Sequence, residues 1–148
     1  MPANAIVTPR LIVREADKAI AFYTNVFGAR ERHRFTMPDG RIIDAELIFE
    51  NGSGLTLTSE DKDNQNVAPK SLGGSAVILS LATVDPDAVC KRAVAAGAKV
   101  VFPVADQFYG RREGRIKDPF GHIWILSKTI EDLTPAEIQA RVDQWASA

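Results

Sequence analysis

The chain has almost no cysteine and no long apolar run, and each absence excludes a class of protein. Cys90 is the only cysteine among 148 residues, so no internal disulfide can form. No apolar stretch approaches the roughly 20 residues that a membrane-spanning helix needs. The N-terminus lacks the basic and apolar regions of a secretory signal. We therefore expect a cytoplasmic protein with no membrane partner.

An excess of one charge is missing as well. The 18 Lys and Arg residues nearly balance the 19 Asp and Glu residues, which leaves a formal net charge of −1. This balance gives no electrostatic reason to expect a nucleic acid as partner. What the chain does contain, 45% apolar and 25% charged residues, is typical of a globular fold with one domain or two small halves that share a core.

The first half of the chain is expected to contain one helix and four strands. Apolar residues recur at three- and four-residue spacing from Glu15 to Phe27, which predicts a helix that Gly28 ends as a C-cap. Clear alternation from Arg41 to Glu50 predicts a strand. The other expected strands cover 5–14, 30–37 and 55–58.

The second half repeats this order after a polar linker at 61–74. The pattern then predicts a strand at 75–83, a helix that Asp85 caps, and a strand at 99–104. Gly28 and Gly97 follow the two expected helices about 70 residues apart, which indicates an internal repeat of two units that share a core. Thr134 and Glu137 form a capping box that begins a final helix.

The segment from Gln107 to Ser127 supplies the last two strands as a hairpin. Asp118-Pro119-Phe120-Gly121 is a turn sequence, because proline fixes φ and aspartate bonds nearby backbone. Glu113, Arg115 and Lys117 alternate with Arg112, Gly114 and Ile116 before the turn, and residues 123–126 form an apolar run after it. One solvated strand and one buried strand are expected.

The repeat and the hairpin together resemble the vicinal oxygen chelate superfamily, which holds glyoxalase I, bleomycin-resistance proteins and extradiol dioxygenases. The PhnB-like subgroup is the most similar, and the resemblance covers nearly the whole chain. The matching segments are Thr8-Pro9, Ala19 to Tyr23, Phe27-Gly28-Ala29, Asp39-Gly40, Ala45-Glu46-Leu47, Gly73-Gly74, Ala93 to Ala98, Phe108-Tyr109-Gly110, Arg112, Asp118 to His122 and Trp124.

The resemblance implies an α+β fold in which paired βαβββ modules form a cupped mixed sheet, and this chain adds a C-terminal helix. We expect a single domain over 1–148, with module one at about 5–60, the linker at 61–74, module two at about 75–128 and the last helix at about 134–146. The resemblance also implies a homodimer. It leaves open whether modules pair within one chain or between subunits.

Catalytic members of this family hold a divalent metal with His, Gln or Glu from the first and last strand of each module. The resemblance places those positions near Thr8, Thr56 (or Thr58), Ile78 and Ile125. Isoleucine cannot donate and a threonine hydroxyl is a poor ligand, so we expect neither a metal nor another cofactor. If this alignment is displaced, a divalent metal is the alternative, and its ligands would come from His33, Asp44, Glu46, Glu60 and His122.

The resemblance further implies that one face of each strand packs on a helix while the other lines a cavity. The helix-facing residues are expected to be Leu11, Val13, Ile43, Ala45, Leu47, Phe49, Leu55, Leu57, Leu79, Leu81, Trp124 and Leu126. The cavity-facing residues are expected to be Thr8, Arg10, Ile12, Ile42, Asp44, Glu46, Ile48, Thr56, Thr58, Ile78, Ser80, Ile123, Ile125 and Ser127.

Asp44 and Glu46 lie two residues apart on the expected cavity face, and two neighbouring carboxylates suit general acid–base chemistry. The alternative is that they form ion pairs with Arg10 or Arg112. Aromatic walls and a guanidinium fork for an anionic or planar ligand are expected from a second segment. The complete set of expected ligand-binding residues is Thr8, Arg10, Asp44, Glu46, Thr56, Phe102, Phe108, Tyr109, Arg111 and Arg112.

Three functions remain open at this point. The first is metal-free binding of a small aromatic or amphipathic molecule in the cavity, either as sequestration of the bleomycin-resistance kind or as metabolite binding. The second is a metal-dependent lyase, isomerase or dioxygenase, whose chemistry needs a Lewis acid. The third is an acid–base enzyme that uses Glu46 without a metal. The ligand itself is not indicated by the sequence.

Overall fold

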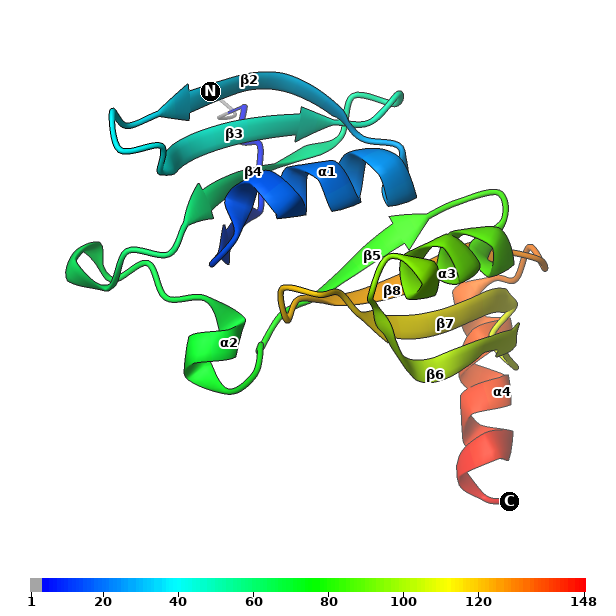
Figure 1. Cartoon of the computed structure of the whole chain (residues 1–148). Helices are drawn as coiled ribbons and strands as arrows, with labels where there is room; N and C mark the ends of the chain where they lie inside the picture. Colours follow the sequence, from blue (N-terminus) through cyan, green and yellow to red (C-terminus); the bar gives the residue numbers. More distant parts are fainter. Residues whose placement is uncertain (1–3) are drawn as a thin grey trace. The chain divides into compact units, whose positions relative to one another are not determined.

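The computed structural model describes residues 4–148, and they divide into two compact units (Figure 1). The first unit runs to Ser75 and also includes Phe120–His122. The second unit comprises Ala76–Pro119 and Ile123–Ala148. Each unit contains one βαβββ order of elements, so the predicted α+β class with two such modules and a C-terminal helix is confirmed.

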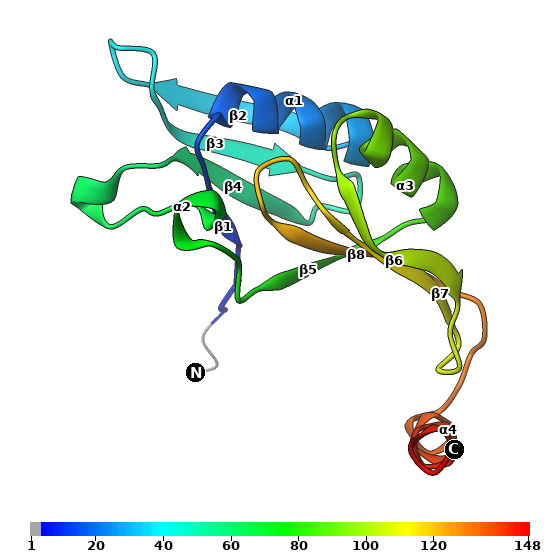
Figure 2. The ribbon, with the colours of Figure 1, turned by 60° about the horizontal axis from the view of Figure 1, so that its bottom comes forward.

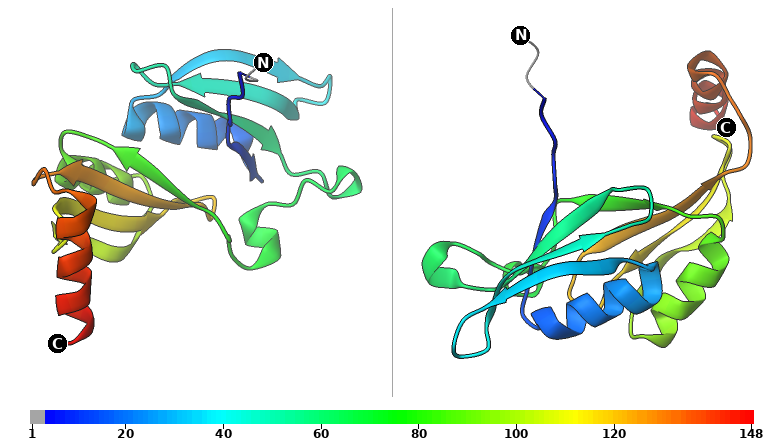
Figure 3. Two further views of the ribbon diagram at one scale, coloured as in Figure 1. Left: turned by 180° about the vertical axis from the view of Figure 1, so that it is seen from behind. Right: turned by 90° about the horizontal axis from the view of Figure 1, so that it is seen from above.

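The first unit is a four-stranded mixed sheet with a helix across one face (Figure 3). Its strand order is β1-β4-β3-β2, in which β1 and β4 are parallel and the other pairs antiparallel. Its elements are β1 Arg10–Val13, α1 Ala16–Phe27, β2 Arg30–Thr36, β3 Ile42–Ile48, β4 Gly54–Ser59, the 3₁₀ turn η1 Lys62–Asn64 and α2 Pro69–Leu72. The first strand is therefore shorter than the expected 5–14, and the predicted linker contains two short helical turns.

Helix α1 packs its aromatic side chains on this sheet because they recur at helical spacing. Tyr23 is fully buried, and its ring stacks on Phe27 with centroids 5.7 Å apart. Phe120 joins the same core at 6.0 Å from Phe22. The helix ends where predicted, since Gly28 adopts a left-handed φ of 78° and its N–H donates to the Thr24 carbonyl.

The prediction of which face each β3 side chain occupies is wrong at the start of the strand. Ile42 was expected in the cavity and Ile43 against the helix, but Ile42 is only 4% exposed and Ile43 is 42% exposed. The cause is a bulge: Phe35 pairs with Asp44 and Thr36 with Ile42, so Ile43 is an extra residue. An extra residue in one strand reverses the alternation beyond it.

The second unit is a second four-stranded mixed sheet, with α3 across one face (Figure 2). The strand order is β5-β8-β7-β6, with β5 and β8 parallel. Its elements are β5 Ile78–Ala82, α3 Pro86–Ala95, β6 Lys99–Asp106, β7 Arg111–Lys117, β8 Ile123–Thr129 and α4 Pro135–Ala146. The predicted β7–β8 hairpin is present, and the Trp124 Nε1–H donates to the buried Asp118 carboxylate at 2.9 Å.

The edge strand β6 is irregular opposite Gly114. Phe102 pairs with Arg115 and Ala105 with Glu113, so Pro103 and Val104 both lie opposite this one glycine. A proline is tolerated at a bulge of an edge strand because no ladder bond needs its missing N–H. A Cβ on Gly114 would lie 2.8 Å from the Val104 backbone nitrogen and 2.9 Å from the Phe102 oxygen. The backbones approach each other too closely for any larger residue.

Helix α4 lies beyond the connection between β6 and β7 and buries no residue of its own (Figure 2). The predicted capping box is present, because the Glu137 N–H donates to the Thr134 hydroxyl and the Glu137 carboxylate accepts in return. Arg141 donates to the Phe108 carbonyl and pairs with Glu131, both at 2.9 Å. No helix among residues 4–148 is long and apolar enough to cross a membrane.

Candidate functional site

In each unit the long helix covers one face of the sheet, and most of the polar candidates lie on the other face. We call these the first and second open faces. On the first open face, Arg10, Thr56, Glu46 and His33 follow one another across β1, β4, β3 and β2. They alternate along their strands with fully or nearly fully buried residues such as Leu11, Leu57 and Ala45.

His33 lies between the two predicted carboxylates of the first open face. Its Nε2 is 3.1 Å from an Asp44 oxygen and its Nδ1 is 3.3 Å from a Glu46 oxygen. The ring also stacks on Phe35 with centroids 4.7 Å apart. An imidazole in this position can donate to either carboxylate, so the cluster can hold or move a proton.

The predicted ion-pair alternative for Asp44 is also observed. Arg10 Nη1 is 2.9 Å from an Asp44 oxygen, and Nη2 donates to the Ile43 carbonyl at 2.8 Å. Arg112 takes no part in this pairing. It lies on the helix-bearing side of the second sheet and pairs with Asp87 of α3 at 2.7 Å and with Asp106 at 2.9 Å.

A second polar cluster is centred on Glu113 of the second open face. The Tyr109 hydroxyl donates to one Glu113 oxygen in a short hydrogen bond, and the Ser127 hydroxyl donates to the other at 2.9 Å. Arg111 Nη1 donates weakly to Ser127 at 3.5 Å. Burial, then the hydrogen bond to Glu113, raises the pKa of Tyr109 to about 12. Tyr109 is therefore a protonated donor at neutral pH.

The same face carries cations beside exposed apolar side chains. The Arg115 guanidinium lies 5.2 Å from the Phe102 ring centroid, a cation–π contact. Ile78 is 45% exposed and pairs with Ile123 of β8, and Ile125 pairs with Arg115. The apolar and charged rows therefore adjoin each other across β8 and β7.

The structure thus divides the predicted ligand residues into two groups. Arg10, Asp44, Glu46 and Thr56 lie on the first open face, and Phe102, Tyr109 and Arg111 lie in or beside the second. Thr8 is exposed and precedes β1, while Phe108 stacks on Trp145 of α4 at 5.4 Å. Ser127 was expected to face the cavity and His33 was named only as an alternative metal ligand, whereas Glu113 and Arg115 were expected only in a solvated strand.

The residues that the resemblance places near the family's metal-ligand positions do not fit a divalent metal. Ile78 and Ile125 offer no donor atom, and the Thr56 and Thr58 hydroxyls donate to the carbonyls of Pro9 and Ser59. The alternative ligands are also engaged: the His122 Nε2–H donates to the Ile12 carbonyl, and Glu60 accepts from the Ala68 N–H. Within residues 4–148, no group of three His, Cys, Asp or Glu residues is arranged to hold a metal ion.

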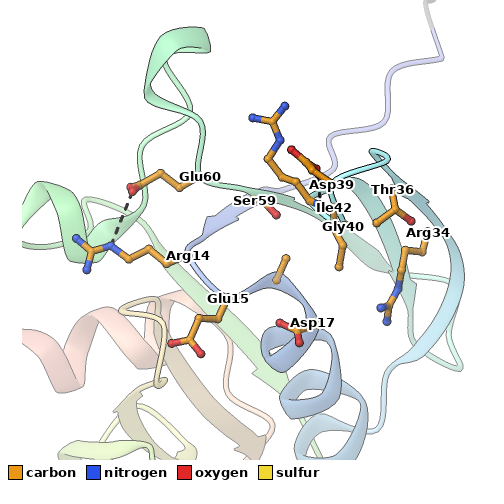
Figure 4. A pocket seen from close by; sticks show the side chains of 12 residues that line it. Arg14, Glu15, Asp17, Arg34, Thr36, Asp39, Gly40, Ile42, Ser59 and Glu60 are labelled. Carbon is orange, nitrogen blue, oxygen red and sulfur yellow. Dashed lines mark hydrogen bonds and ion pairs between the residues drawn. The ribbon is translucent and has the colours of Figure 1, made fainter.

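A cavity of about 630 Å³ lies on the other side of the first sheet, at the start of α1 (Figure 4). Its lining is charged, but its arginines are already paired. Arg14 lies 3.8 Å from Glu60, Arg34 pairs with Glu31 at 2.6 Å, and Arg41 pairs with Asp61 at 3.1 Å. This cavity contains none of the predicted ligand-binding residues.

With its two βαβββ units, the chain falls in a class of small α+β proteins built from paired modules of this kind. The chain belongs to the Glyoxalase/Bleomycin resistance protein/Dioxygenase superfamily, whose family model matches residues 5–126. An uncharacterised protein of Mycobacterium tuberculosis is 40% identical over 139 residues, which cover 90% of this chain and 80% of the relative.

Solved structures show the same fold. A gene product of Arabidopsis thaliana has a TM-score of 0.66 and 27% identity, covering 84% of this chain and 99% of that one. The fosfomycin resistance protein FosX of Listeria monocytogenes, solved with Mn(II) and sulfate, has a TM-score of 0.67. At 17% identity, over 95% of this chain and 99% of that chain, it is similar to this protein in fold alone.

Proposed function

We propose that the chain binds a small aromatic or amphipathic molecule on its second open face without a bound metal. One observation carries this proposal. Ile78 and Ile125, which the resemblance places near the family's metal-ligand positions, form an apolar surface with Ile123 beside the polar cluster of Glu113. A mainly apolar surface with a few fixed polar groups is typical of small-molecule sites.

A fluorescent apolar probe tests this proposal. We expect phenylnaphthylamine to bind the wild type, and Ile125→Glu to weaken that binding at least about tenfold, because an isoleucine contributes about 1.5–3 kcal/mol when it is covered. The matched control is Ile130→Glu, since Ile130 is exposed and lies just after β8. Equal affinity of Ile125→Glu and the wild type would contradict the proposed surface.

Native mass spectrometry before and after chelator tests the metal-free part. We expect no bound divalent ion. We also propose that the chain is a PhnB-like protein that forms a homodimer, and the same spectrum reports the number of subunits. One divalent ion per subunit that is lost with chelator would make the metal-dependent lyase, isomerase or dioxygenase the leading function instead.

Acid–base catalysis on the first open face is a second candidate, because His33 contacts both Asp44 and Glu46. A pH-dependent turnover that is lost in Glu46→Gln would support it. An unchanged pH–rate profile in that variant would contradict it.

A further inference from the structure

The second open face carries four cationic side chains that form no ion pair with any described residue. Arg111, Arg115 and Lys117 alternate along β7 on this face, and Lys99 of β6 lies directly opposite Lys117. Within residues 4–148, none of these four lies within ion-pair distance of a carboxylate, whereas Arg112 on the other face contacts two. Like charges directly opposite each other destabilise a pair of strands.

Arg115 adds an unsatisfied donor to this face. Its Nε is buried and has no hydrogen-bond partner in the part of the chain that the structure describes, although the guanidinium contacts the Phe102 ring. A buried donor without an acceptor costs free energy that a bound acceptor removes.

Glu113, the acidic residue on the same face of β7, is not the hydrogen-bond acceptor of the Arg115 Nε. Glu113 already accepts from Tyr109 through one oxygen and from Ser127 through the other. Within residues 4–148, no ion pair joins Glu113 to Arg115 or Lys117, so both cations remain available to an acceptor from outside the chain.

We propose that the second open face recognises the anionic head group of an amphipathic ligand. Arg115, Lys117 and Lys99 surround the anion, and Ile123 and Ile125, one strand away, contact the apolar body. The head group is a carboxylate or a phosphate, since both present several acceptor oxygens to guanidinium and ammonium donors. The inference rests on the proposed small-molecule binding and names the class of ligand.

Two dyes with similar rings separate charge recognition from apolar binding. Anilinonaphthalene sulfonate carries an anion, and phenylnaphthylamine does not. We expect Arg115→Gln to weaken the anionic dye about tenfold, the loss typical of one charge-assisted hydrogen bond, and to change the neutral dye less than about twofold. Lys117→Gln, at an exposed position that needs no repacking, should show the same difference.

The control is Lys128→Gln, which removes the same charge from an exposed residue paired with Arg112 on the other face. It should bind both dyes as the wild type does. Circular dichroism confirms that each variant is folded.

The outcomes separate the inference from the proposed function. Equal losses for both dyes in Arg115→Gln and Lys117→Gln, or no loss for either, would overturn the anion proposal while small-molecule binding stands. A wild type that binds neither dye would overturn the proposed function itself. Displacement of the anionic dye by octanoate or by octyl phosphate, but not by octanol, supports the proposal and identifies the head group. Equal displacement by octanol contradicts it.

Discussion

Replacing Gly114 with alanine should destabilise the second unit by an amount that the backbone geometry sets. The new Cβ would lie 2.8 Å from the Val104 nitrogen and 2.9 Å from the Phe102 oxygen. Both are backbone atoms, so no side-chain rotation relieves the contact and β6 has to move away. Overpacking of this kind costs about 2 kcal/mol. For a chain of this size, that lowers the melting temperature by about 4–8 °C.

Thermal and urea unfolding followed by circular dichroism measure this loss. Gly74→Ala is the matched control, because its Cβ meets nothing within 4 Å and its φ is not left-handed. That control should remain within about 1 kcal/mol of the wild type or become more stable. Movement of β6 also displaces Phe102 from Arg115, so Gly114→Ala should bind the anionic dye more weakly. A melting temperature equal to that of the wild type would show that β6 does not approach β7 as described.

Three further perturbations test other contacts. Trp124→Phe removes the indole donor from buried Asp118 and should cost about 1–3 kcal/mol in urea unfolding; a loss below about 0.5 kcal/mol would contradict the role of this bond. The hydrogen bond from Arg112 holds the pKa of the Asp87 carboxyl below its ordinary value of 3.8. The stability that this ion pair contributes is therefore fully present above about pH 3.8 and is lost as the pH falls through the lowered pKa. Asp87→Asn should therefore lower stability at neutral pH and flatten its dependence on acid, and an unchanged acid profile would refute this. The raised pKa of Tyr109, about 12, means that the stability from its protonated phenol is complete below about pH 10 and is lost as the pH rises toward 12. In a pH titration followed by phenolate absorbance, the late step should be present in the wild type and missing in Tyr109→Phe. A wild type whose tyrosines all titrate near pH 10 would disprove this.

Local patterns were enough to predict most elements. The end of α1 at Gly28 and the start of α4 at Thr134 depend on residues within one turn, so sequence signals identified both. The helix-facing sides of β4 and β8, which the family resemblance implied, are confirmed, since Leu55, Leu57, Trp124 and Leu126 are all buried. The reversal at Ile42 and Ile43 was not predictable in this way, because the bulge depends on pairing with β2.

The candidate sites show the same limit. The pairing of Arg10 with Asp44 was among the expected alternatives, but His33 was not placed beside Glu46 because their contact depends on the register between two strands. Alternation of Glu113, Arg115 and Lys117 indicated a solvated strand and no more. The Phe102 ring that contacts the Arg115 guanidinium comes from the neighbouring strand β6, so this feature depends on pairing across the sheet.

The irregular β6 has a consequence for how the folded chain behaves in a crowded solution. Val100, Val101 and Phe102 lie on the edge of the second sheet and are 46%, 42% and 58% exposed. An exposed apolar edge is a template on which strands of other molecules add and begin to aggregate. Pro103 interrupts that template, because it offers no N–H to an incoming strand and stands in a bulge that breaks the even spacing. We therefore expect Pro103, which lies opposite Gly114, to limit the addition of strands from other molecules to this edge.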